Sequence, residues 1–345
     1  MKIYSTVCFF LICNILTAQG FIANHLANAK PSKLDTIIKL HTYQGTSVDF
    51  PLTIIKGAKT GPTFTLIAGI HGMEYPPILA ASNLRNSIKP NSLKGNVIIV
   101  PLANINAFYK RTPFTNPIDN KNLNRVFPGN KNGSITQVIA HFITQELFAI
   151  STVVLDIHAG DVNEDLLPFI CYYNNTSYKE QTKLAATLCD SSGFTNIVSY
   201  PYTLGANEPA EYAFKQAVQQ GITGISIEMG KLGLVSPTEV NTIEKSVLNI
   251  LAKLQMYKQP ESHNFIKRNY FTNQKYIYAS AQGILNSSYR AGDVVKKGTI
   301  IGTIKDIFGN ELSQMIAPET GTILYKIGTP PVNKDETVFC IGIQK

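Results

Sequence analysis

Apolar runs and amphipathic segments alternate along the chain from about residue 47 to residue 257. The apolar runs predict strands by their periodicity, and they read FTLIAGI, NVIIVPL, TVVLDIH, LLPFICYY, NIVSY and ITGISIEMG. Helical spacing predicts helices at residues 78–87, 134–148, 178–191, 209–219 and 237–257. Strands that alternate with helices predict a largely parallel sheet covered on both faces, with its site beyond the carboxyl ends of the strands.

The pattern changes after a polar stretch at residues 258–270, which has the composition of a linker. The runs that follow are short and separated by glycines, as in GDVVKKGTIIGTI and QMIAPETGTIL, which predicts a small all-β domain. We therefore predict a leader at residues 1–20, a catalytic α/β domain at residues 21–260, and a linker with a β domain at residues 261–345.

The first twenty residues have the features of a secretory signal peptide. Lys2 precedes an apolar stretch from Val7 to Leu16, and small residues near Ala18 to Gly20 suit cleavage. The stretch is short for a membrane span, so an uncleaved anchor is the weaker alternative. No other segment predicts a membrane span, and we expect a periplasmic or secreted protein.

Export permits disulfides among the cysteines that follow the leader. Cys171, Cys189 and Cys340 allow one disulfide and leave one free thiol, and Cys171 and Cys189 are typical of buried thiols.

The net charge of +8 on 345 residues is spread along the chain rather than gathered in a stripe. No basic segment is interleaved with aromatic residues, which argues against nucleic-acid binding. A positive balance is compatible with an anionic substrate.

GIHGMEYPP, which directly follows the first predicted strand, carries the leading candidate chemistry. It contains His71 and Glu74, and the run TVVLDIH later ends in His158. Two imidazoles and one carboxylate are a common ligand set for a catalytic zinc ion. The simpler alternative is that His71 caps a helix and His158 is a hydrogen-bonded core histidine.

Glu228 and Asp156 are the candidate acids beside this ligand set. Glu228 ends a buried strand, where an unpaired charge is costly, so we predict a general base that takes a proton from water. Its alternative is a structural salt bridge. Asp156 shares a strand face with His158, and its carboxylate can interact with the ring nitrogen that does not bind the metal.

The loop NPIDNKNLNRVFPG carries the candidate substrate contacts. Arg125 can bind a planar carboxylate through two parallel hydrogen bonds, and Asn124 can add amide contacts. Arg111 is a further candidate for contact with the scissile carbonyl. The alternative for Arg125 is a surface arginine paired with Asp119, and the alternative for Arg111 is a solvated surface charge beside Lys110.

GIHGMEYPP, DNKNLNRVFPG, LDIHAGD and SIEMG, in this order, resemble the succinylglutamate desuccinylase/aspartoacylase family of the zinc carboxypeptidase-like group. The resemblance implies a three-layer α/β/α domain with a mixed sheet, one zinc ion per chain, and hydrolysis of an N-acyl amino acid. By matching positions it implies zinc ligands at His71, Glu74 and His158, a base at Glu228, and a carboxylate clamp at Asn124 and Arg125. Arg111 is a looser match to the family's arginine that contacts the substrate.

The C-terminal segment resembles a biotinyl/lipoyl-type barrel-sandwich hybrid, and the resemblance implies that it packs near the mouth of the active site. The matching turn, from Phe308 to Glu311, has no lysine at its tip, which argues against a carrier role. Relatives that act on aspartyl or glutamyl substrates resemble one another in an arginine shortly before the catalytic glutamate. This chain has none between Arg125 and Arg268, and Lys215 would be a different recognition device.

Three hypotheses follow for the function. The first is an exported zinc amide hydrolase that deacylates an N-acyl amino acid with a free carboxylate. The second is a zinc carboxypeptidase that acts on short or cell-wall peptides. The third, from another class, is an inactive binding module. The sequence does not indicate an oligomeric state.

Overall fold

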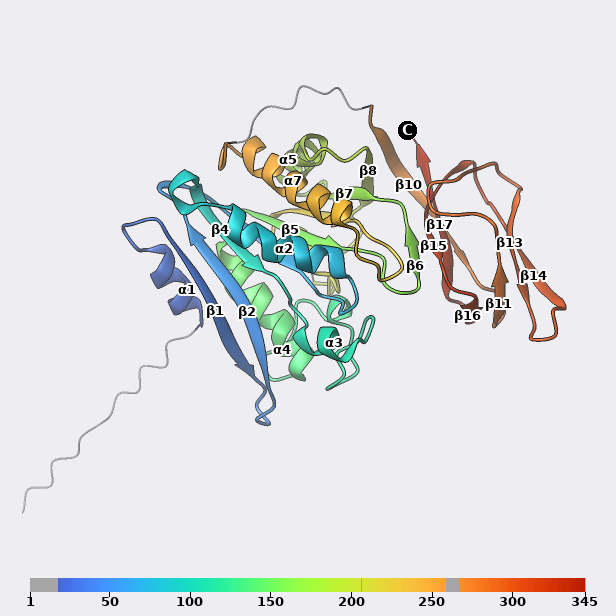
Figure 1. The fold of residues 1–345 in the computed structure, drawn as a ribbon, viewed down its shortest axis with the longest axis horizontal. Helices are drawn as coiled ribbons and strands as arrows, with labels where there is room; N and C mark the ends of the chain where they lie inside the picture. The colour runs from blue at the N-terminus through green and yellow to red at the C-terminus, as the bar shows by residue number, and fades with distance from the viewer. Residues whose placement is uncertain (1–17, 206, 259–266, 345) are drawn as a thin grey trace, which may run out of the picture.

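A single mixed sheet of thirteen strands runs through most of the protein (Figure 1). The computed structural model describes residues 18–205, 207–258 and 267–344. The strands of this sheet are β1 (Ser32–His41), β2 (Ser47–Lys56), β3 (Lys59–Ala68), β4 (Lys94–Val100), β5 (Val153–His158), β6 (Glu164–Leu166), β7 (Phe169–Asn174), β8 (Asn196–Pro201), β9 (Thr223–Glu228), β10 (Asn269–Tyr278), β12 (Val294–Val295), β15 (Gly321–Ile327) and β17 (Thr337–Gln344). Their order is β1-β2-β4-β3-β5-β9-β7-β8-β10-β17-β15-β12, and β6 pairs with β15.

Helices cover both faces of the N-terminal part of this sheet (Figure 1). The helices are α1 (Ala18–Leu26), α2 (Tyr75–Ser87), α3 (Ile105–Lys110), α4 (Ile135–Phe142), α5 (Lys179–Ser191), α6 (Ala213–Gln219) and α7 (Pro237–Lys253), with short helical turns at Pro90–Ser92, Leu123–Arg125, Ile143–Leu147 and Phe148–Ile150. One core joins α2, α5 and α7 to one sheet face, and another joins α1, α4 and α6 to the opposite face. The result is the three-layer α/β/α domain that the resemblance implied.

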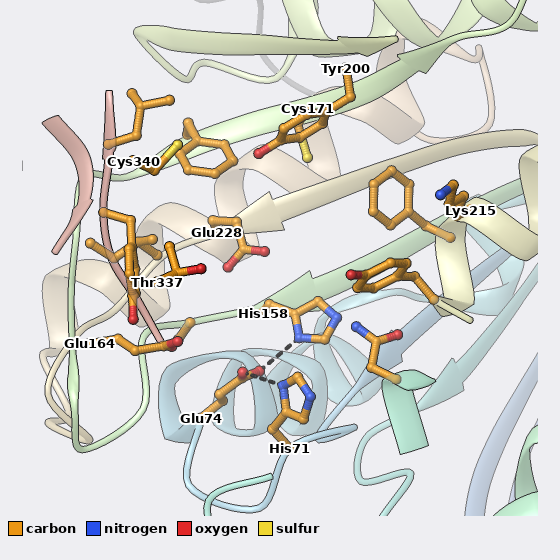
Figure 2. Close-up of a pocket in the computed structure, with 18 of the residues that line it drawn as sticks. His71, Glu74, His158, Glu164, Cys171, Tyr200, Lys215, Glu228, Thr337 and Cys340 are labelled. Carbon is orange, nitrogen blue, oxygen red and sulfur yellow. Dashed lines mark hydrogen bonds and ion pairs between the residues drawn. The ribbon is translucent and has the colours of Figure 1, made fainter. Parts of the chain in front are cut away.

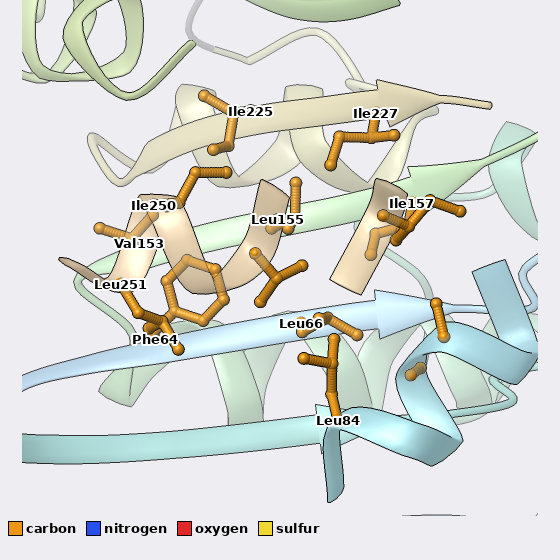
Figure 3. Packing of buried hydrophobic residues seen from close by; sticks show 14 of the residues in the cluster. Phe64, Leu66, Leu84, Val153, Leu155, Ile157, Ile225, Ile227, Ile250 and Leu251 are labelled. Atoms are coloured by element: carbon orange, nitrogen blue, oxygen red, sulfur yellow. The ribbon is translucent and has the colours of Figure 1, made fainter. Parts of the chain in front are cut away.

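Alternation along the strands explains the two cores. On β5, Val153, Leu155 and Ile157 belong to the first core, whereas Val154 belongs to the second. Figure 3 shows side chains of the first core packed between the strands and the helices. Because both sheet faces are buried, these strands are nearly continuous apolar runs in the sequence.

The centre of the sheet is parallel, and both parallel and antiparallel pairs lie beyond it. β3 pairs in parallel with β4 and β5, and β5 pairs in parallel with β9. β7 runs antiparallel to β9, and β2 runs antiparallel to β4. β8 pairs in parallel with both β7 and β10. The sheet is therefore mixed, as the resemblance implied, and the largely parallel sheet predicted from the alternation alone is correct for its centre and for the pairs around β8.

The six predicted strands correspond to β3, β4, β5, β7, β8 and β9, but two predicted helices differ from the structure. The helix predicted at residues 209–219 begins only at Ala213, because Glu211 has a φ of 67° and its backbone bonds to Phe127 instead. The helix predicted at residues 134–148 leaves α geometry after Phe142 for π and 3-10 turns. The helices α1 and α3 and the strands β1 and β2 were not predicted.

The C-terminal part forms its own apolar core but shares the main sheet. A second sheet in this part has the order β14-β13-β11-β16, with β11 (Gly283–Asn286), β13 (Ile300–Lys305), β14 (Glu311–Ile316) and β16 (Pro331–Val332). β10 pairs in parallel with β8 of the α/β part, so the sheet continues from one part into the other (Figure 1). The turn from Phe308 to Glu311 joins β13 to β14, and its phenylalanine is exposed.

Some predictions for the ends and the cysteines can be compared with the described residues. The predicted leader lies outside them, apart from residues 18–20 at the start of α1, and so does most of the predicted linker. Cys171, Cys189 and Cys340 are all buried free thiols, so the disulfide that the sequence allowed does not form. Within the described ranges, no helix is long and apolar enough to cross a membrane.

We expect Leu155→Ala to lower the free energy of unfolding by about 3 kcal/mol, because it leaves a cavity in a fully buried position. Urea denaturation followed by circular dichroism measures this change. Ile37→Ala is the matched control, since Ile37 is 63% exposed on the edge strand, and we expect a change within about 0.5 kcal/mol. Equal losses in the two variants would contradict the assigned core.

Candidate functional site

The parallel strands β3, β5 and β9 carry three candidate side chains to one edge of the sheet. β5 ends at His158 and β9 ends at Glu228, and these two residues are direct register partners. β3 ends at Ala68, and the turn that follows carries His71 before α2 begins. The parallel register therefore explains why segments far apart in the sequence meet.

The turn between β3 and α2 is held tightly and directs its polar side chains toward the cavity. Gly69 has a φ of 66°, and a Cβ at Gly72 would lie 2.4 Å from the carbonyl carbon of Ala107. Glu74 occupies the N-cap position of α2 without capping it, so its carboxylate is free to face the histidines. Pro76 and Pro77 lie in the first turn of the helix, where missing amide donors are tolerated.

His71, Glu74 and His158 form a compact donor set in which one atom of each lies within 4.8 Å of the others (Figure 2). His71 Nδ1 is 2.6 Å from Glu74 Oε1, and His158 Nδ1 is 2.9 Å from Glu74 Oε2. All three side chains are buried. Two imidazole nitrogens and a carboxylate turned toward one point are a suitable donor set for a divalent metal.

The outer nitrogen of each imidazole faces an oxygen atom. His71 Nε2 is 3.2 Å from Asn122 Oδ1, and His158 Nε2 is 3.0 Å from Asp156 Oδ2, although the latter pair is not aligned for a hydrogen bond. Oxygen atoms at this position favour a proton on the outer nitrogen, Nε2. Nδ1 is then unprotonated, and its lone pair is available to a metal ion. Asp156 therefore lies where it was predicted, whereas Asn122 was missed. It is one asparagine among several in its loop, so nothing in the sequence separates it from its neighbours.

The charges of this group perturb one another strongly. Burial alone would raise the pKa of Glu74, but His71 and His158 outweigh this effect and lower that pKa to about 2. Burial would lower the pKa of His158, yet Asp156 and Glu74 raise it well above its usual value. An excess of buried acid thus surrounds the imidazoles, which is an environment that a metal cation would stabilise.

Two further carboxyl groups line the same cavity. Burial, with repulsion from Glu74 and Asp156, raises the pKa of Glu228 to about 8 despite the opposing effect of His158. Burial, followed by repulsion from Asp161 and Glu74, raises the pKa of Glu164 to about 8. Glu164 was not predicted from the sequence. Its only indication there is its position, as an acidic residue that begins the strand-like stretch after His158.

Asn124 and Arg125 lie together on a wall of the cavity, as their loop predicted. Asn124 Oδ1 accepts a hydrogen bond of 2.9 Å from the backbone amide of Ala213, which is the first residue of α6. This bond uses the acceptor and leaves the amide hydrogens for another partner. The Arg125 guanidinium donates to the Asn124 carbonyl at 2.7 Å and stacks 4.6 Å above the ring of Tyr212, so its orientation is fixed.

Lys215 lies on the same side, with its ammonium 5.6 Å from the rings of both Tyr173 and Tyr212. Burial lowers the pKa of Lys215, although two nearby glutamates oppose the shift. Arg111 is exposed at the left-handed C-cap of α3, and it is not among the residues that line the cavity. The structure therefore does not bring Arg111 to the other candidates.

The cavity has a volume of about 500 Å³ and lies between the two parts of the chain (Figure 2). The C-terminal part contributes one side of its lining, with Tyr276, Leu324, Tyr325, Thr337 and Cys340. The implied position of the C-terminal domain beside the active-site mouth is thus observed.

Comparison with known proteins shows which family has this arrangement. The profile of the succinylglutamate desuccinylase/aspartoacylase catalytic domain matches residues 60–254. The chain belongs to this family. N-alpha-acetyl-L-2,4-diaminobutyric acid deacetylase of Halomonas elongata is 29% identical over 307 residues, which are 86% of this chain and 86% of that protein.

Solved structures of the family share the fold. A succinylglutamate desuccinylase/aspartoacylase from Rhodobacter sphaeroides superposes with a TM-score of 0.81 at 19% identity, over 92% of this chain and 96% of that chain. The product-bound ectoine utilization protein EutE (DoeB) from Ruegeria pomeroyi gives 0.81 at 22% identity, also over 92% and 96%. Because both coverages exceed nine-tenths, the likeness extends over the C-terminal part as well.

We expect Asn124→Ala to lower the free energy of unfolding by about 1–3 kcal/mol, because the buried amide of Ala213 loses its acceptor. Asn124→Asp keeps an oxygen at that position and should retain most of the stability. Thermal unfolding of the two variants measures the difference. Equal destabilisation by both substitutions would show that the bond to Ala213 does not hold the loop.

Proposed function

We propose that the protein is a zinc-dependent amide hydrolase that removes the acyl group from an N-acyl amino acid with a free carboxylate. The observation that carries the proposal is one cavity containing the His71–Glu74–His158 donor set, a buried carboxyl at Glu228, and the fixed pair Asn124 and Arg125. Family membership and the named deacetylase from Halomonas elongata support the same reaction.

Two imidazoles and one carboxylate are a donor set that catalytic zinc ions commonly have. Nδ1 of both imidazoles faces the carboxylate of Glu74, and the outer nitrogens face Asn122 and Asp156. A zinc ion held by these three residues would polarise the scissile carbonyl and lower the pKa of the attacking water.

Glu228 then acts as the general base in our proposal. It ends β9 beside His158, so its carboxylate can accept a proton from the attacking water and return it to the leaving nitrogen. A nearby cation would bring the raised pKa of Glu228 down toward neutrality, which is the range that suits a base at physiological pH.

Asn124 and Arg125 bind the carboxylate of the amino-acid portion and fix its distance from the scissile bond. Arg125 is stacked on Tyr212 and bonded to the Asn124 carbonyl, so little conformational freedom is lost when substrate binds. Aromatic walls and the C-terminal part limit the access of bulk water to the reacting group.

We also propose that the protein is exported. This proposal rests on the first twenty residues alone, in which Lys2 precedes an apolar stretch and small residues follow it.

We expect His71→Ala to lose both the bound metal and nearly all amide hydrolysis, while the purified wild type binds about one zinc ion per chain. Elemental analysis and an assay with N-acetyl amino acids measure the two properties. His41→Ala, at an exposed position of β1, is the control and should keep both. Full activity in His71→Ala would refute the proposed metal site, and a wild type that binds no zinc would favour a binding module.

We expect Arg125→Ala to raise KM about 30-fold, because a charge-assisted hydrogen bond of about 2 kcal/mol is lost. The wild type should also prefer an N-acetyl amino acid to its carboxamide, and Arg125→Ala should not. Arg85→Ala is the control. Arg85 lies in the last turn of α2 and pairs with Asp35 of β1, away from the cavity lining. If Arg125→Ala still prefers the carboxylate, the clamp lies elsewhere in the cavity.

A further inference from the structure

Glu164 lies on a part of the cavity wall to which the proposed reaction assigns no role. It begins β6, a short strand that pairs with β15 of the C-terminal part. Glu164 and Leu166 both line the cavity, whereas Asp165 between them does not. Strand alternation explains this difference, because neighbouring side chains point to opposite faces.

The two acidic residues of β6 differ in their partners. Asp165 Oδ1 is paired with Lys231 Nζ at 3.0 Å, and its second oxygen accepts from the amide of Ala291. Glu164 Oε2 accepts from the amide of Asp161 at 3.2 Å, and no ion pair to Glu164 occurs among the described residues. The acid that faces the cavity is therefore the one that lacks a counterion.

The cavity has basic side chains at one end and an acidic side chain at the other. Arg125 and Lys215 gather around the ring of Tyr212. Figure 2 shows Glu164 on the other side of the donor set from Lys215. A substrate whose carboxylate is held by Arg125, and whose scissile carbonyl lies at the donor set, therefore extends its acyl group toward Glu164.

The surroundings of Glu164 suit a small cationic group on an apolar stem. Leu166 lies on the same strand as Glu164 and is the register partner of Tyr325, so these two residues and Leu324 supply apolar surface on this side. Thr337 adds a hydroxyl (Figure 2). Asp161 is fully buried next to Glu164, and its Oδ2 has no hydrogen-bond partner in the described part of the chain. A partly desolvated carboxyl in such a setting gains more from an arriving ammonium than a solvated one does.

We propose that Glu164 is a specificity-determining residue that binds an ammonium group on the acyl side of the scissile amide. The preferred substrate is then an aminoacyl derivative of an amino acid, that is, a small dipeptide with a free amino terminus, rather than a simple acyl derivative. This inference rests on the proposed amide hydrolysis and adds the chemical class of the acyl group.

A purely structural role is the competing explanation, because Glu164 also ties the turn at residues 161–164 through the Asp161 amide. Glu164→Gln separates the two roles. The glutamine keeps an oxygen that can accept this bond, but it loses the charge that an ammonium requires.

The test compares glycyl-L-alanine with N-acetyl-L-alanine, which differ by the ammonium on the acyl group, using the zinc-loaded full chain at pH 7. We expect the wild type to favour the glycyl substrate by about 10- to 100-fold in kcat/KM. Glu164→Gln should reduce this ratio to about one and leave hydrolysis of the acetyl substrate nearly unchanged. Asp165→Asn removes a carboxylate from the other face of the same strand and should keep the ratio.

Other outcomes would overturn the inference in distinguishable ways. Equal losses on both substrates in Glu164→Gln would indicate a structural role. A wild type that hydrolyses N-acetyl-L-alanine without preferring the glycyl compound would refute this inference and leave the proposed function intact. Hydrolysis of neither would refute both. A Glu164-dependent preference for Nα-acetyl-2,4-diaminobutyrate over Nα-acetyl-2-aminobutyrate, without one for glycyl-L-alanine, would place the ammonium on the leaving amino acid instead.

Discussion

The parallel register of β3, β5 and β9 is the constraint on which the candidate site depends. Parallel strands end at one edge of a sheet, so residues delivered by separate segments meet there without any long-range contact of their own. His158 and Glu228 are direct register partners, and the turn after β3 brings His71 and Glu74 to the same place. A shift of β9 by one residue against β5 would turn Glu228 to the opposite face and separate its carboxyl group from the donor set.

Several buried carboxyl groups lie at the same edge, and their negative charge has to be balanced by nearby positive charge. Glu74 is stabilised as a carboxylate by two imidazoles, while Glu228 and Glu164 are driven toward their neutral forms by burial and by repulsion from neighbouring acids. Packing alone does not offset such an arrangement, because an uncompensated buried charge costs several kcal/mol. A metal cation at the donor set, and a cationic substrate group near Glu164, would each supply the missing positive charge. On this proposal, the same ligands would support both stability and function.

The sequence could predict the residues whose position follows from strand ends. His71, His158 and Glu228 each follow or end an apolar run, so the edge they share could be predicted before any distance was known. Residues positioned by loop conformation were harder to predict. Asn122 reaches His71 through a helical turn at Leu123–Arg125, and Arg111 turns to solvent because a left-handed residue ends α3. Glu164 depends on the pairing of β6 with β15, a contact between segments more than 150 residues apart that no local pattern specifies.

The pairing of β6 with β15 adds a second connection between the C-terminal part and the α/β part, beside the continuous main sheet. β8 pairs with β10, and a mixed apolar core containing Phe169, Phe271 and Leu324 spans the boundary. In the proposed binding mode, the two ends of the substrate would be contacted by different parts of the chain. The loop before α4 and the helix α6 line the end proposed for the carboxylate, whereas β6, β15 and β17 line the end proposed for the acyl group. Because the donor set and Glu228 belong to neither end, the proposal implies that substitutions along β15 or β17 would change which acyl group is accepted without altering the reacting groups.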